Sequence, residues 1–324
     1  MQRYEKNLYI CILLTSDLFF MKKYLLLSVI LFSTLFVKGQ ETYTFLVRDT
    51  LEMKLDVYQP EHPRKDGACV VYLFGGGFVM GERNNDFSVK CCKMLAERGF
   101  VAVAIDYRLY LKHAPHVSLL KAHTLFDTAI RQAVEDCSAA LAWLCRNASE
   151  LKIDTSHIVL TGSSAGAITV LQTDYCRANS LPPASSLPQG FKPAAVIPYA
   201  GGLYCGASQL KYVVPPAPTC FFHGTKDRIV NYNSFRGSLN KALFGANRVV
   251  KIFEKKGYNH WILRFDGRGH EIAAALPQTI DEFCAFVDAT LSGRVMQYDS
   301  HCTDTNIRLT EWSNMSLLDL YKGL

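Results

Sequence analysis

Short continuous apolar runs recur along the chain and alternate with segments of helical periodicity. Segments with helical periodicity span about 87–98 and 130–151. The apolar runs cover 69–74 (CVVYLF), 101–107 (VAVAIDY), 157–162 (HIVLTG), 194–202, 218–224 and 249–254. Runs without polar alternation are typical of strands buried on both faces of a parallel sheet. This pattern predicts an α/β fold with a mostly parallel sheet and helices on both faces. A hairpin over 42–47 and 51–58, turning near Asp49, precedes it.

Chemically useful residue types follow four of the predicted strands. Glycines follow the run at 69–74, and a serine between glycines follows 157–162. An aspartate follows 218–224, and a histidine in a glycine-rich loop follows 249–254. Because ligands bind at the carboxyl ends of parallel strands, we expect these residues to gather at one edge of the sheet.

Length and composition indicate one large globular domain. The chain has 324 residues, 49% of them hydrophobic, with no repeat and no low-complexity tract. An undivided α/β domain of this size is common. The formal charge is +6, of which +3 lies in residues 1–38, a segment with five basic and two acidic side chains. The remaining charge is scattered among acidic residues, which disfavours a nucleic-acid partner.

The N-terminal segment is typical of an export signal. Two lysines follow Met21, then 24–37 carries no charge, and Gly39 supplies a small residue for cleavage. We therefore predict a signal peptide over 21–39, a spurious extension over 1–20 and a periplasmic or secreted protein. An uncleaved anchor is the alternative, but the apolar run is short for a membrane span, so we expect no stable span in the mature chain.

Cysteine and histidine spacing gives no sign of a metal or cofactor. Ten cysteines lie beyond residue 40, none in a CxxC pair, and most sit in apolar patterns typical of small buried side chains. Export permits disulfides, but their pairing cannot be read from spacing. His113, His116 and His123 match no strong ligand pattern. We predict no metal and no cofactor.

Ser164 is the candidate nucleophile. It is the middle serine of Gly162-x-Ser164-x-Gly166, placed between a predicted strand and a predicted helix. A serine on such a sharp turn exposes its hydroxyl, and the glycines avoid clashes there. The neighbouring Ser163 is expected to make a structural hydrogen bond instead.

His270 and Asp227 are the candidate base and orienting acid. The base takes the serine proton and returns one to the leaving group, while the acid holds its tautomer. The order Ser164, Asp227, His270 is that of an α/β-hydrolase sheet. His260 is the rival histidine, interpreted as a structural or pocket residue, and Asp266 is the rival acid.

Backbone amides would stabilise the oxyanion. Gly76 and Gly77 lie in the glycine loop, and Ala165 follows the nucleophile. Such N–H groups donate without changing their protonation. A glycine turn without a ligand is the alternative.

Taken together, these motifs resemble the serine esterases of the α/β-hydrolase superfamily, nearest the hormone-sensitive-lipase-like and carboxylesterase-like branch. The segments that carry the resemblance are Phe74–Phe78, Asp106–Leu109, Gly162–Gly166, His223–Asp227 and Gly269-His270. It covers about 45–292 and implies a sheet of about eight strands in a domain spanning 41–292. Phe74 departs from the family's usual histidine. Asp106-Tyr107-Arg108 is expected to be an ion-paired structural corner.

Three further features are expected around the site. Residues 110–130 form an insertion that would act as a lid or pocket wall. Phe78, Tyr204 and Trp261 are candidate substrate contacts. The tail 293–324 falls outside the resemblance and has no assigned role.

The resemblance implies a serine hydrolase that cleaves carboxylic esters through an acyl-enzyme, and the N-terminal pattern predicts that it is exported. A small-molecule ester or an acylated glycan is the expected substrate, the glycan being suggested by export rather than by any residue. Two alternatives stay open: an exopeptidase-like serine hydrolase, and a non-catalytic binding protein on the same scaffold. Oligomeric state is not indicated.

Overall fold

A computed structural model describes residues 40–113, 119–208, 210–236, 240–294, 297–303 and 306–321. The predicted extension and signal peptide lie outside these residues, as do the side chains of His113, His116 and His123.

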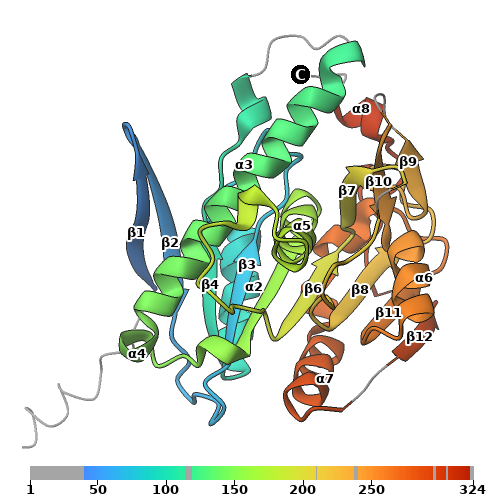
Figure 1. The fold of residues 1–324 in the computed structure, drawn as a ribbon. Coiled ribbons are helices and arrows are strands. Elements are labelled where there is room, and N and C mark those ends of the chain that lie inside the picture. The colour runs from blue at the N-terminus through green and yellow to red at the C-terminus, as the bar shows by residue number, and fades with distance from the viewer. Residues whose placement is uncertain are drawn as a thin grey trace, which may run out of the picture. The chain divides into compact units, whose positions relative to one another are not determined.

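A nine-stranded sheet forms the centre of the described domain (Figure 1). Its strands, in spatial order, are β1 (Glu41–Arg48), β2 (Leu51–Tyr58), β4 (Val101–Ile105), β3 (Cys69–Leu73), β5 (Ile158–Ser163), β6 (Ala195–Tyr199), β8 (Thr219–Gly224), β11 (His260–Phe265) and β12 (Gln297–Cys302). The predicted hairpin is confirmed as β1 and β2, which pair antiparallel, and the strands from β4 to β12 run parallel. The predicted α/β fold is therefore confirmed, with nine strands where about eight were expected.

Helices cover both faces of this sheet. The α-helices are α2 (Asp86–Glu97), α3 (Leu119–Arg146), α4 (Ala148–Leu151), α5 (Ala165–Ala178), α6 (Ala246–Lys256), α7 (Ile280–Leu291) and α8 (Leu317–Tyr321). The 3₁₀ turns are η1 (Tyr110–His113), η2 (Thr155–His157), η3 (Pro182–Ala184), η4 (His270–Ala274), η5 (Leu276–Gln278) and η6 (Glu311–Ser313). The connections from β3 to β4 and from β4 to β5 run in opposite directions along the sheet. Right-handed crossovers therefore put α2 and α3 on opposite faces. Figure 1 shows α3 and α5 side by side in front of the sheet.

The run at 249–254 is helical, so the prediction of a strand there was wrong. It lies in α6, and the strand that leads to His270 is β11. Val249, Val250 and Phe253 are buried whereas the lysines between and after them are exposed, which is the spacing of an amphipathic helix. The β-branched side chains of Val249 and Val250 favoured a strand, but the helical spacing of the buried residues was the better signal.

Two features of the fold were not expected. A small antiparallel sheet is formed by β7 (Gly202–Gly206), β10 (Lys241–Gly245) and β9 (Ser234–Arg236). The tail adds β12 to the main sheet, parallel to β11. Among the described helices, none is long and apolar enough to cross a membrane.

Candidate active site

Ser164 lies on a strained turn between β5 and α5. Its backbone angles, φ 49° and ψ −112°, are unusual for a residue with a side chain. Glycines allow the turn to pack: a Cβ at Gly162 would lie 2.5 Å from the backbone of Gly166, and one at Gly166 would lie 2.5 Å from the carbonyl oxygen of Phe74. The Ser164 N–H donates to the Tyr199 carbonyl at 2.9 Å, which ties the turn to β6.

The structure brings Ser164, His270 and Asp227 together. The Ser164 hydroxyl lies 2.8 Å from His270 Nε2, and His270 Nδ1 lies 2.8 Å from Asp227 Oδ2. All three residues are buried, and they come from three separate loops, after β5, β8 and β11. This relay has the geometry with which a serine hydroxyl is activated.

Asp227 is held by more than His270. Its other oxygen, Oδ1, accepts from the N–H groups of Ile229 and Val230 at 2.9 and 3.1 Å. Burial by itself would raise the pKa of Asp227. The charge of His270 and the hydrogen bond of His223 outweigh burial and hold this pKa well below its ordinary value. The acid therefore stays ionised where it must face an imidazolium.

His223 is a contact that the sequence analysis did not assign to the site. It is buried at the end of β8, with Nε2 2.9 Å from the Val230 carbonyl oxygen and 3.4 Å from Asp227 Oδ2. Its place four residues before Asp227, at a strand end, was the available signal. Through Val230 and Asp227, His223 braces the loop that carries the acid.

The glycine loop after β3 lies against the nucleophile turn. A Cβ at Gly75 would lie 3.3 Å from the Ser164 Cβ. Gly76 and Gly77 have positive φ values of 126° and 63°, and the N–H groups of Val79 and Met80 donate to the Gly76 carbonyl. The loop thus has its own internal hydrogen bonds, and Gly75 lies against Ser164, directly before Ala165, the first residue of α5. The use of the Gly76, Gly77 and Ala165 amides as oxyanion donors stays a prediction. Amides at such a helix N-terminus favour negative charge.

Tyr107 braces the loop where the expected histidine is absent. Its hydroxyl donates to the Phe74 carbonyl at 2.8 Å, and its ring stacks on the Phe74 ring with centroids 4.4 Å apart. The expectation that this segment is an ion-paired corner is confirmed: Arg108 pairs with Asp136 at 2.8 Å and Asp106 pairs with Arg83 at 3.1 Å.

Two of the three candidate substrate contacts share an aromatic cluster next to the glycine loop. Phe78 follows Gly77 and is fully buried, with its ring edge-on to Phe126 at 5.7 Å. Phe126 in turn meets Tyr204 at 5.3 Å. Sequence reasoning missed Phe126, although it comes from the insertion 110–130. The described part of that insertion consists of the turn Tyr110–His113 and the first turns of α3. Phe126 of α3 contributes to the wall beside the loop, while the action of the insertion as a lid stays a prediction.

Trp261 does not lie at this edge of the sheet, so we correct its assignment as a pocket residue. It is the second residue of β11, near the amino end of the strand, and its ring packs on Phe286 and Tyr298. The strand starts at His260, which contacts the Tyr258 carbonyl and is structural, as expected. The sequence analysis did not recognise the limits of β11, so it placed Trp261 near the site, whereas the residue lies near the amino end of the strand.

The rival acid and a metal centre find no support among the described residues. Asp266 pairs with His301 at 2.9 Å, whereas His270 pairs with Asp227. No cluster of three metal-ligating side chains occurs in the described part of the chain.

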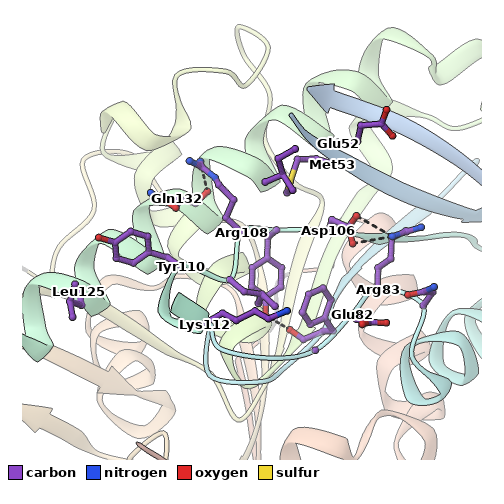
Figure 2. Close-up of a pocket in the computed structure, with 16 residues that line it drawn as sticks. Glu52, Met53, Glu82, Arg83, Asp106, Arg108, Tyr110, Lys112, Leu125 and Gln132 are labelled. Carbon is purple, nitrogen blue, oxygen red and sulfur yellow. Dashed lines mark hydrogen bonds and ion pairs between the residues drawn. The ribbon is translucent and has the colours of Figure 1, made fainter. Parts of the chain in front are cut away.

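A cavity of about 680 Å³ borders the glycine loop through Phe74 and Gly81. Figure 2 shows its mixed lining, with the Arg83–Asp106 ion pair on one wall and Lys112 and Tyr110 on another. The three relay residues do not line it. It is a space of mixed lining next to the glycine loop rather than the reaction centre.

Comparisons with known proteins agree with this architecture. The BD-FAE family model matches residues 55–180. Esterase 2 from Thermogutta terrifontis superposes with a TM-score of 0.57 over 79% of this chain and 94% of that chain, at 22% identity. The chain has the α/β-hydrolase fold of these esterases.

Curated proteins match the chain over shorter stretches. Lipase 2 from Moraxella sp. (strain TA144) is 32% identical over 33% of this chain and 21% of its own length. Ethyl acetate hydrolase from Pseudomonas putida is 30% identical over 37% of this chain and 33% of its own length. Non-reducing polyketide synthase ausA from Emericella nidulans is 31% identical over 45% of this chain. The matched stretches span between 6% and 33% of these relatives' lengths.

Proposed function

We propose that the hydrolase cleaves carboxylic esters through an acyl-enzyme on Ser164. The observation that carries the proposal is the buried relay from Ser164 through His270 to Asp227, with 2.8 Å at both steps. The names of two relatives, a lipase and an ethyl acetate hydrolase, point to the same chemistry.

The proposed reaction has two halves, acylation of Ser164 and hydrolysis of the acyl-enzyme. The Ser164 oxygen attacks the ester carbonyl while His270 Nε2 takes its proton, and the carbonyl becomes an oxyanion beside the amides of Gly76, Gly77 and Ala165. Collapse breaks the ester bond, and His270 gives its proton to the leaving alcohol. Water then repeats the sequence on the acyl-enzyme, releasing the acid and restoring Ser164.

The decisive experiment is labelling of residues 41–324 with a fluorophosphonate probe, read by intact mass. Wild type and Ser163→Ala are expected to gain one adduct, and Ser164→Ala none. Ester hydrolysis by Ser164→Ala should fall by at least about 10⁴-fold, because the nucleophile is removed. The adjacent Ser163 is the matched control, since it differs from Ser164 by one position. An unlabelled, folded wild type would favour a binding protein, and faster cleavage of aminoacyl anilides than of esters would favour an exopeptidase.

The substrate proposal is finer: an acyl ester carried by a carbohydrate. The cavity beside the glycine loop supports it, because its largely apolar lining also carries charged and amide side chains, such as Lys112 and Gln132, that can hydrogen-bond to the hydroxyl groups of a sugar. Tyr110→Ala should raise the KM for acetylated xylo-oligosaccharides and leave that for p-nitrophenyl acetate unchanged. An equal change for both substrates would contradict the carbohydrate site.

Export is a further part of the proposal, resting on the basic and apolar pattern of 21–39. N-terminal sequencing of the mature protein should begin near Gln40. A chain that retains Met21 would contradict cleavage.

A further inference from the structure

The tail beyond β11 returns to the edge of the sheet that carries the site. β12 runs parallel to β11 in register from His260↔Gln297 to Phe265↔Cys302, so both strands end at the same edge. The N–H of Asp266, just after β11, donates to the Cys302 carbonyl at 3.0 Å. Residues 306–321, which we name the C-terminal strap, then follow.

The strap contacts the loop that carries the base. A Cβ at Gly269, the residue before His270, would collide with the backbone carbonyl of Ser313. Ser313 itself is buried, and η6, to which it belongs, packs on η4, the turn that begins at His270. The backbone of the base loop therefore lies directly against the backbone of the strap.

The same strap contacts the loop that carries the acid. Arg228, the residue after Asp227, forms a parallel β-bridge with Ser316. The Leu317 N–H donates to the Arg228 carbonyl at 3.1 Å. Both contacts are made by backbone atoms immediately next to a relay residue, one on each loop.

The strap is anchored independently of these loops. Ile307 is buried in the hydrophobic core, and Thr310 and Ser313 form a reciprocal capping box at η6. The hydroxyl of Ser316 donates to Asp319 at 2.6 Å. Met315, Leu317 and Leu320 pack against the core. The strap can thus restrain two loops that arise from different strands.

We propose that the C-terminal strap is a positioning element that holds the loops of Asp227 and His270 in register with each other. Leu317 is its positioning residue toward the acid loop, through its backbone N–H. This role rests on the proposed ester hydrolysis, because alignment of the relay matters only if Ser164 reacts. It accounts for a segment that lies outside the hydrolase motifs of the sequence.

A matched pair of variants tests the backbone contact. Leu317→Pro removes the N–H, and proline is tolerated at the first position of a helix such as α8. Leu317→Ala keeps the N–H and removes most of the side chain. We expect Leu317→Pro to lower kcat for p-nitrophenyl acetate roughly tenfold with little change in KM. Misplacement of a catalytic group by ~1 Å costs about 10²-fold in rate, and the loss of one backbone contact should shift the acid loop by less than that. Leu317→Ala should stay near wild type in kcat.

Amide hydrogen exchange gives a readout that does not depend on activity. In Leu317→Pro, and in a chain ending at Thr303 that keeps β12, peptides covering 226–231 and 267–272 should exchange faster than in wild type. Exchange at the wild-type rate in both loops of these variants would overturn the proposal. An unchanged kcat with a lower Tm in Leu317→Pro would also overturn it, as would a loss of kcat in Leu317→Ala equal to that in Leu317→Pro. If wild type fails to react with the fluorophosphonate probe, the proposed function fails, and the exchange comparison still decides the role of the strap.

Discussion

Asp227 shows how much of this site depends on a single side chain. Its two oxygens receive two backbone N–H groups on one side and His270 on the other, with His223 close by. An ionised carboxylate buried without such partners would be costly. Here the partners keep it charged and fix the direction of the imidazole.

Acidification should expose the contribution of Asp227 to stability. Its pKa is lowered in the folded protein from an ordinary value of 3.8, so its stabilising effect is fully present above that pH and is lost as the pH falls further. The difference in unfolding free energy between wild type and Asp227→Asn should therefore be constant from pH 7 to about 5 and shrink below about 4. Urea titrations across this range measure it. A difference that grows on acidification would contradict the lowered pKa.

Single residues were predictable where a motif combined with a strand end. Ser164 and Asp227 each follow a predicted strand that the structure confirms. His270 was found from its glycine-rich loop and from the order of the three residues, because the strand predicted before it was wrong. Phe126 and His223 were missed because their roles depend on contacts across the fold. Trp261 was misassigned because the limits of β11 were not recognised, so its distance from the carboxyl edge could not be judged.

Among the elements, the junction of β4 with α3 is held by a buried ion pair. Asp136 of α3 is fully buried and accepts from the Arg108 side chain at 2.8 Å and from the Arg108 N–H at 2.9 Å. Burial raises the pKa of Asp136, and Arg108 opposes that rise. The pair thus links the segment that braces the glycine loop to the longest helix described.

Removing the arginine should destabilise the protein strongly. Arg108→Ala leaves the buried Asp136 carboxylate with the backbone N–H of residue 108 and with Arg48 at 3.8 Å, so the free energy of unfolding should fall by about 3 kcal/mol. Arg131→Ala, which breaks an exposed pair with Glu135 on the same helix, is the control and should cost less than about 0.5 kcal/mol. Urea denaturation of the three proteins compares them. Similar losses in both variants would contradict a special role for the buried pair.

Helices and strands were predictable where the hydrophobic residues of a segment followed one clear spacing. The buried strands and the first hairpin follow from their apolar runs, but α6 was mistaken for a strand because its β-branched residues mimic one over six positions. The start of α3 lies well before the predicted residue 130, since the insertion continues the helix. β12 carries no buried hydrophobic run, and only its pairing with β11 makes it a strand.

Across the whole domain, stability comes from one continuous core that spans both faces of the sheet. The cysteines of the described residues form no disulfide. Most are buried, and burial raises the pKa of the Cys137 and Cys176 thiols to about 12. Such side chains act as small hydrophobic groups, as their sequence contexts indicated.

Thiol counting tests this description. Residues 41–324 should show ten reactive thiols in denaturant, and fewer in the native state, where only Cys145, Cys284 and Cys302 are partly exposed. A reductant should leave Tm unchanged. A count below ten in denaturant without reductant would reveal a disulfide and contradict the structure.

The crowding of glycines around Ser164 has a consequence for any survey of tolerated substitutions. Side chains at Gly75, Gly162 and Gly166 would meet backbone or the nucleophile turn itself. A deep mutational scan scored by activity should therefore find these positions as intolerant of substitution as the three relay residues. Yet the glycines at 162 and 166 have no side chain that could contact a substrate. Directed evolution toward new substrates should accordingly leave this turn untouched and vary the aromatic wall and the cavity that borders the glycine loop.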